Sequence, residues 1–305
     1  MPSRLGSIDR LRALARFNGS TVANTRVDEV PVAPAAPRAA RSTPRIASII
    51  LTALLAPFTY VGTRSLFLLR AAEVWRHRFH GGLLARQLQF VGFESIPIVV
   101  LVGFFSGGVA AESSLAALKM FRQEVSVGGI VGVSLARELA PVFTALMLSA
   151  RAGAGMAAEI GSMRITEQID ALLSFGAEPT QHLIMPRVLA GMLMTPIMTM
   201  VFNVVGLFGA YLVAVHLRQV DPGGVLHTFR FYTDPLDYLE GAIKAVAFGI
   251  AFTLVACYQG FNVRGGAREL GRATTNAVVE GAVAILVLDY FLTDVMLVIW
   301  PPRTL

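Results

Sequence analysis

Residues 188–215, VLAGMLMTPIMTMVFNVVGLFGAYLVAV, form a stretch of 28 residues without one Asp, Glu, Lys or Arg. A helix needs about 20 consecutive apolar residues to cross a hydrocarbon core roughly 30 Å thick. A second uncharged stretch of 19 residues, AVAFGIAFTLVACYQGFNV, covers 245–263. Both stretches have the length of a membrane-spanning helix, so the sequence predicts an integral membrane protein.

The composition of the whole chain agrees with this prediction. Of its 305 residues, 54% are hydrophobic and 15% are charged, and the mean hydropathy is +0.62, well above that of a soluble globular domain. Three further apolar stretches predict spans at 95–111, 127–150 and 273–300. The expected fold is therefore all-α, with five transmembrane helices.

The first 45 residues account for most of the net charge. Segment 1–45 contains eight arginines and three acidic residues, against a net charge of +6 for the whole chain. Because the charge is concentrated in one segment, a nucleic-acid-binding stripe is disfavoured. We interpret 1–45 as a disordered cytoplasmic tail. An organellar transit peptide is the alternative, weakened by Asp28 and Glu29.

The sequence of residues 46–90 is typical of a helix that lies at the membrane interface. Pro57 interrupts an uncharged stretch over 46–63, and arginines follow on the same stretch. The spacing of His77 and His80 would suit a metal, but no third ligand is near, and we assign no metal there. The transmembrane core is then expected over 91–300.

The distribution of Arg in the loops predicts the orientation. The Arg-rich tail places the N-terminus in the cytoplasm, and alternation places the Arg-rich loop at 264–272 on the same side. Polar loops are expected at 151–187 inside and at 218–240 outside, the latter being rich in Asp and Glu. This pattern predicts a multi-pass membrane protein whose N-terminus lies in the cytoplasm.

The motifs of the common enzyme classes are missing from the sequence. A Walker A motif needs Gly directly before Lys, and neither Lys119 nor Lys244, the two lysines of the chain, has it. There is no HExxH, no GxSxG and no Cys/His cluster, and Cys257 is the single cysteine, interpreted as a packing residue. We therefore expect no catalytic residue, no metal and no cofactor.

Arg137 and Glu138 stand inside an otherwise apolar span. A charge at the centre of a membrane costs about 2.5 to 3.5 kcal/mol on insertion scales and is normally paired or hydrated. Adjacent residues point about 100° apart on a helix, so each of these two needs a different partner. They belong either to a polar gate on a substrate path or to a structural ion pair between helices.

Two other features lead to separate hypotheses. Lys244, Glu280, Asp289 and Asp294 lie in or near spans, and pairing of Lys244 with a carboxylate of the last span would relieve the cost of both charges. Gly103 and Gly107 form a GxxxG motif, which allows close helix packing either within one subunit or at a dimer seam.

A short amphipathic helix is expected in the loop after the second span. Ile165, Ile169, Leu172 and Leu173 share one face, and Gly176 provides a stop. This helix would dock into a groove of a separate subunit or lie on the membrane surface.

The segments SLARELAPVFTALMLSARAGAGMAAEIGSMRITEQIDAL, PRVLAGMLMTPIMT and GRATTNAVVEGAVAILVLDYFLT resemble, in this order and spacing, the MlaE (YrbE) family of permeases. The resemblance covers about 80–298. It implies an MlaE-type permease fold: a homodimeric ABC transporter permease with an N-terminal interfacial helix and five transmembrane helices. An extension of about 45 residues departs from the shorter family members.

The resemblance also implies partners and a function. Family members move phospholipids or related lipids between the inner membrane and a periplasmic MCE-domain protein (MlaD-like), supporting outer-membrane lipid homeostasis. ATP is bound by a separate cytoplasmic ATPase (MlaF-like), often with a STAS-domain subunit (MlaB-like). The alternative is a proton-linked secondary carrier using Glu138 and Asp289. An intramembrane lipid-modifying enzyme is a third class, without a motif to support it.

The resemblance assigns site residues as well. It places a coupling helix at about 159–173 and a lipid cavity along the first span, where GFFSGGVAAESS departs from the family pattern. The implied residues of the lipid cavity or gate are Arg137, Glu138, Val102, Phe105 and Val109. Those implied for coupling to the ATPase are Glu159, Arg164, Glu167, Gln168 and Asp170.

Overall fold

The structure is a computed structural model that describes residues 81–176 and 178–299. Helices account for nearly all of these residues, and the described part contains no strand. The predicted tail, most of the interfacial region and the His77/His80 pair lie outside the described residues.

Five helical stretches are long and apolar enough to cross a membrane, which confirms the predicted number. They cover Gly82–Phe121, Glu124–Ile165, His182–Leu217, Pro235–Phe261 and Ala267–Ile299.

The first stretch is built from α3 (Gly81–Val91), η2 (Phe93–Ser95), α4 (Ile96–Leu118) and η3 (Lys119–Phe121). The second comprises η4 (Glu124–Ser126), α5 (Val127–Ser134), η5 (Leu135–Leu139), α6 (Ala140–Leu148), η6 (Ser149–Gly153) and α7 (Ala154–Ile165). The short helix α8 (Gln168–Ser174) follows. The rest of the chain forms η7 (Thr180–Ile184), α9 (Met185–Tyr211), η8 (Leu212–Leu217), α10 (Pro222–Tyr232), α11 (Pro235–Phe261) and α12 (Ala267–Ile299).

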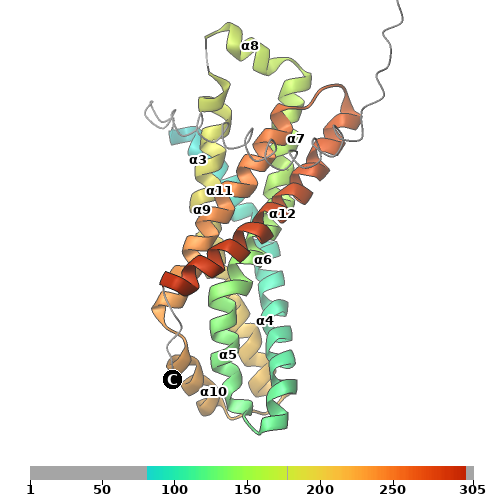
Figure 1. Ribbon diagram of the computed structural model, residues 1–305. Helices are drawn as coiled ribbons and strands as arrows, with labels where there is room; N and C mark the ends of the chain where they lie inside the picture. Colours follow the sequence, from blue (N-terminus) through green and yellow to red (C-terminus); the bar gives the residue numbers. More distant parts are fainter. Residues whose placement is uncertain (1–80, 177, 300–305) are drawn as a thin grey trace, which may run out of the picture. The chain divides into compact units, whose positions relative to one another are not determined.

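Both predicted polar loops are largely helical, which corrects the sequence-based bounds. In 151–187 the second span continues to Ile165, α8 follows, and helix resumes at Thr180. In 218–240 the chain forms α10 and the first turn of α11. The charged residues Arg151, Glu159 and Arg164 are each paired within the protein, so they do not end the second helical stretch. Figure 1 shows α8 and α10 at opposite ends of the bundle.

Glycines bring the helices of the bundle into backbone contact. A side-chain carbon added to Gly107 would collide with the carbonyl oxygen of Gly206, and one added to Gly103 would lie 3.3 Å from the carbonyl oxygen of Phe202. The GxxxG motif of α4 therefore packs on α9 within one chain, which decides between the two predicted alternatives. Helices α9 and α11 make a similar contact through Gly191.

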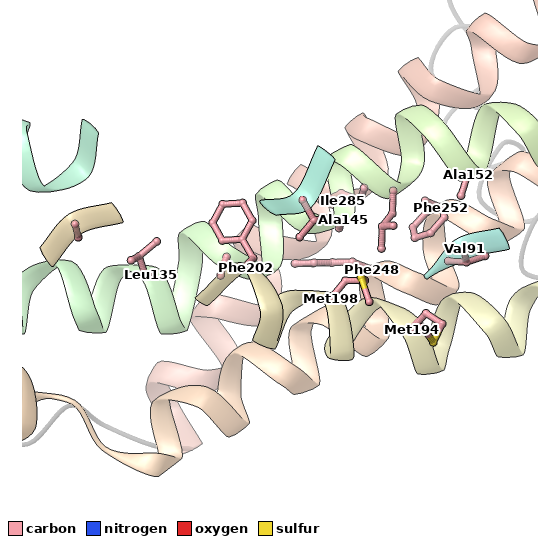
Figure 2. Close-up of a cluster of buried hydrophobic side chains, with 14 of the residues drawn as sticks. Val91, Leu135, Ala145, Ala152, Met194, Met198, Phe202, Phe248, Phe252 and Ile285 are labelled. Atoms are coloured by element: carbon pink, nitrogen blue, oxygen red, sulfur yellow. The ribbon is translucent and has the colours of Figure 1, made fainter. Parts of the chain in front are cut away.

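The core lies where these helices meet, around α9 and α11. Figure 2 shows Phe202, Phe248 and Phe252 together with smaller residues from the second span and from α12. Cys257 is fully buried in a second cluster with Ile160, Ile169 and Ile184. This position confirms that Cys257 is a packing residue, and it shows that Ile169 anchors α8 to the end of the bundle.

Candidate functional site: an intramembrane ion network and the helix α8

Arg137 and Glu138 lie in η5, a π-helical turn between α5 and α6. A π turn interrupts the regular helical hydrogen bonds and often occurs at functional sites. The Nε atom of Arg137 donates to Oδ1 of Asp237 at 2.7 Å and lies 3.5 Å from Oε2 of Glu240. Asp237 also accepts from the backbone N–H of Asp234 at 2.8 Å, so one carboxylate both caps α11 and binds Arg137.

Glu138 takes a different partner, as predicted from the helix geometry. Its Oε1 lies 2.7 Å from Nζ of Lys244, whose side chain is fully buried. The same ammonium donates to Oγ1 of Thr293 at 2.8 Å and lies 3.8 Å from Oδ1 of Asp289. The last-span carboxylate that lies beside Lys244 is Asp289, while Glu138 is the closer partner.

Together these residues form one ion network that joins the second span, α11 and α12. It contains two cations and four carboxylates, and Glu240 lies between the cations, 4.0 Å from Lys244. Removing one of several carboxylates around a buried cation should destabilise the network less than removing the cation, because loss of the cation leaves several carboxylates without their partner. The arrangement therefore makes Lys244 the residue on which the network depends most.

Sequence reasoning missed three members of this network. Asp237 and Glu240 were assigned to an external loop, yet both are 3% exposed and sit in the first two turns of α11. Thr293 was not considered. The spacing of Asp237, Glu240 and Lys244, i, i+3 and i+7, places all three on one helix face. That periodicity was the available signal.

A further ion pair, also missed, ties the second span to the start of the first. Arg151 in η6 forms an ion pair with Glu94 and donates to Oγ of Ser95 at 2.9 Å and to the carbonyl oxygen of Phe90 at 2.8 Å. Its position in the apolar sequence SARAG was a signal of the same kind as Arg137.

The predicted lipid-cavity residues of α4 are spaced i, i+3 and i+7 and share one helix face, but they differ in exposure. Val102 packs against the core, whereas Phe105 and Val109 are 62% and 64% exposed on the outer side of the helix. An open recess lies elsewhere, between the end of the first span, α5 and α10, with a volume of about 720 Å³. Its lining includes Phe121, Ile130 and Ser134, the last directly before η5.

The predicted coupling segment is two helices rather than one. It breaks at Thr166 and Glu167, where Glu167 has a left-handed backbone with φ of 58°. Arg164 at the end of α7 then binds Oδ1 of Asp170 in α8 at 2.6 Å across the break. Left-handed φ is unfavourable in a helix, so the 159–173 helix cannot be continuous.

The five predicted coupling residues divide between these two helices. Glu159 belongs to α7 and forms an ion pair with Arg187 at 2.7 Å, while Glu167, Gln168 and Asp170 are exposed at the start of α8. Beyond them Leu173 and Phe175 are 54% and 87% exposed. One side of α8 is thus anchored by Ile169, and most side chains on its other side are exposed.

Known proteins provide an independent comparison. The family model described as Permease MlaE matches residues 84–295. A probable ABC transporter permease protein of Rickettsia felis is 39% identical over 235 residues, 77% of this chain and 91% of its own length. The intermembrane phospholipid transport system permease protein MlaE of Haemophilus influenzae is 36% identical over 220 residues, 72% of this chain and 84% of its own length.

A plant protein is more distant. The chloroplastic protein TRIGALACTOSYLDIACYLGLYCEROL 1 of Arabidopsis thaliana is 29% identical over 222 residues, 73% of this chain and 63% of its own length. The matched residues reach all five membrane-length helices and include every residue of the ion network. The chain is a multi-pass membrane protein that belongs to the MlaE permease family.

Proposed function

We propose that this chain is the permease subunit of an ABC transporter that moves phospholipids or related lipids between the inner membrane and a periplasmic MCE-domain protein, supporting outer-membrane lipid homeostasis. The observation that carries the proposal is the similarity to the Haemophilus influenzae protein, whose name states intermembrane phospholipid transport. The end of the bundle that bears α8 would face the cytoplasm, together with the N-terminus.

The open recess supports a lipid as the cargo. Its lining is mainly apolar, and it is too open to enclose a ligand within one chain. A second copy placed against it would close the recess into a shared cavity for acyl chains. Ser134 lines the recess directly before η5, so Arg137 and Glu138 would act as a polar gate at its inner end.

Helix α8 supports a cytoplasmic ATPase as the partner. Its exposed Leu173 and Phe175 offer an apolar anchor, and the exposed Glu167, Gln168 and Asp170 surround it with polar groups, as expected of a helix that docks into a groove. ATP would bind to that partner, and this chain would perform no covalent chemistry. A STAS-domain subunit would join the same cytoplasmic assembly.

The second candidate is a proton-linked carrier. Four carboxylates and two cations in the network leave an excess of acidic groups, and Asp289 keeps one buried oxygen without a hydrogen bond among the described residues. Such a site would bind a proton. This function needs no ATPase, and that difference separates the two candidates.

The test is purification of the tagged full-length protein from its own membranes in mild detergent, with mass spectrometry of proteins and lipids. We expect an ATPase, an MCE-domain protein and phospholipid to co-purify. The reconstituted assembly should transfer lipid only with hydrolysable ATP. Lipid transfer by the chain alone, driven by a pH gradient and indifferent to ATP, would favour the carrier.

A further inference from the structure

A second, smaller pocket lies inside the single chain, at the end of the bundle that bears α10. Its cavity volume is about 140 Å³, below that of sites that enclose a whole small molecule, so it has room for a segment of a longer apolar chain, and its lining carries no charged side chain. The walls come from α4, α5, α9, η8 and α10. None of its lining residues lines the open recess.

Small residues create this space. Ala111, Ala210 and Ala214 stand where larger side chains would fill it. Helix α10 covers the pocket because it packs on a glycine of α5: a side-chain carbon on Gly128 would collide with the carbonyl oxygen of Val225. The close approach of the helices and the small side chains between them leave a gap that no described side chain occupies.

The pocket opens sideways, between α9 and α10. Tyr211 and Leu226 of its lining are 37% and 46% exposed, whereas Ala111 and Ala214 are buried. On the same helix as Tyr211, Val204 and Phe208 are 69% and 60% exposed. Large apolar side chains exposed on a membrane-spanning helix face hydrocarbon. The molecules that meet this opening are therefore lipid acyl chains.

An ion pair stands about one helical turn beyond the pocket, at the end of the third span. Nε of Arg218 donates to Oε2 of Glu112 at 2.8 Å, and a terminal nitrogen, Nη2, binds the other oxygen. Glu112 follows Ala111 of the lining, and Arg218 lies four residues after Ala214. The ends of spans lie at headgroup depth, where Arg anchors to the interface.

Arg218 has hydrogen-bonding capacity left in this pair. A guanidinium carries five N–H donors, and Glu112 engages the Nε and Nη2 nitrogens, which leaves Nη1 for another acceptor. The side chain is 45% exposed. Phosphate oxygens are a preferred partner of arginine.

We propose that this pocket binds one acyl chain of a membrane phospholipid whose phosphate contacts Arg218, forming a lipid site within each chain. The bilayer interior is as apolar as the pocket, so transfer of the chain gains little hydrophobic free energy. Retention depends instead on close packing and on the phosphate contact. The site does not involve α8, an ATPase or the open recess, and it can exist whether or not the proposed transport does.

The pocket itself is tested by filling it. The full-length protein is purified, exchanged into phosphatidylethanolamine and phosphatidylglycerol vesicles, re-extracted, and analysed by native mass spectrometry. Ala210→Phe, which fills the pocket, should retain one phospholipid fewer per chain than the unchanged protein. Val204→Phe adds the same ring to the exposed side of the same helix and should retain the full number. Equal retention by all three overturns the proposal.

The role of Arg218 is tested separately from its ion pair. Arg218→Gln should lower retention of this phospholipid several-fold, whereas Glu112→Gln, which breaks the same pair but keeps the guanidinium, should not. An equal loss in both variants would assign the effect to the ion pair and overturn the phosphate contact. If Ala210→Phe does not fold, electron cryo-microscopy of the unchanged protein in lipid nanodiscs decides: tubular density in the pocket supports the proposal, and an empty pocket overturns it.

Discussion

Nζ of Lys244 on α11 lies 2.7 Å from Oε1 of Glu138 on η5, and the Lys244 side chain is fully buried while that of Glu138 is 38% exposed. The two partners are therefore not equivalent. Without Glu138, Lys244 keeps Asp289 at 3.8 Å and Glu240 at 4.0 Å. Without Lys244, three carboxylates lose their shared cation.

This asymmetry predicts which of two substitutions lowers the stability of the protein more. Lys244→Met should cost roughly 3 to 5 kcal/mol of stability, the range for breaking a buried ion pair, and Glu138→Gln should cost clearly less. Thermal unfolding in detergent measures both. Lys119→Met, an exposed cation outside the network, is the control and should unfold like the unchanged protein. An equal cost for Lys244 and Glu138 would contradict the dependence of the network on Lys244.

Asp237 both caps α11 and pairs with Arg137, and we expect two substitutions to separate these roles. Asp237→Asn keeps a carbonyl oxygen that can accept from the backbone of Asp234 but loses the charge facing Arg137, whereas Asp237→Ala loses both. The alanine variant should therefore be less stable than the asparagine variant by about 1 kcal/mol, a typical value for a helix cap. Denaturation midpoints in the same detergent compare them. If the two variants are equally stable, the cap contributes nothing.

Because α4 and α9 are in backbone contact at Gly107, we expect one added methyl group there to lower stability strongly. Gly107→Ala would force its new carbon against the carbonyl oxygen of Gly206, so the helices must separate and stability should fall by about 1 to 3 kcal/mol. The control is Gly271→Ala on α12, where the added carbon meets nothing within 4 Å. It should be neutral or stabilise by about 0.5 to 1 kcal/mol, because alanine favours a helix.

Because one side of α8 is exposed, we expect a substitution there to weaken binding of the partner without unfolding the protein. Phe175→Ser removes a side chain that is 87% exposed, so thermal stability should not change, yet ATPase binding should weaken at least tenfold if this ring is an anchor of the proposed interface. Ile169→Ser, at a fully buried position in the same helix, should lower stability instead. Binding is measured with the purified ATPase. Unchanged affinity in Phe175→Ser would remove α8 from the proposed interface.

Several features could be predicted from sequence because they depend on local chemistry. Spans of uncharged residues are recognisable since the hydrocarbon core sets a minimum length, and all five were found. Arg137 and Glu138 were identified because they are charged residues in an otherwise apolar span, and each has the separate partner that helix geometry requires. The ends of the elements were less accurate, because the charged residues of 151–165 are paired and because Asp221 caps an additional helix over 222–232.

The sequence alone determined that this is a helical membrane protein with charges buried in its spans, because hydropathy and helical periodicity are properties of neighbouring residues. Only the tertiary structure decided which residues satisfy those charges. Asp237 and Glu240 are far from Arg137 along the chain and meet it because α11 packs against η5. The pocket beside Ala214 also appears only when glycines hold α4, α5, α9 and α10 together, since its space belongs to no single segment.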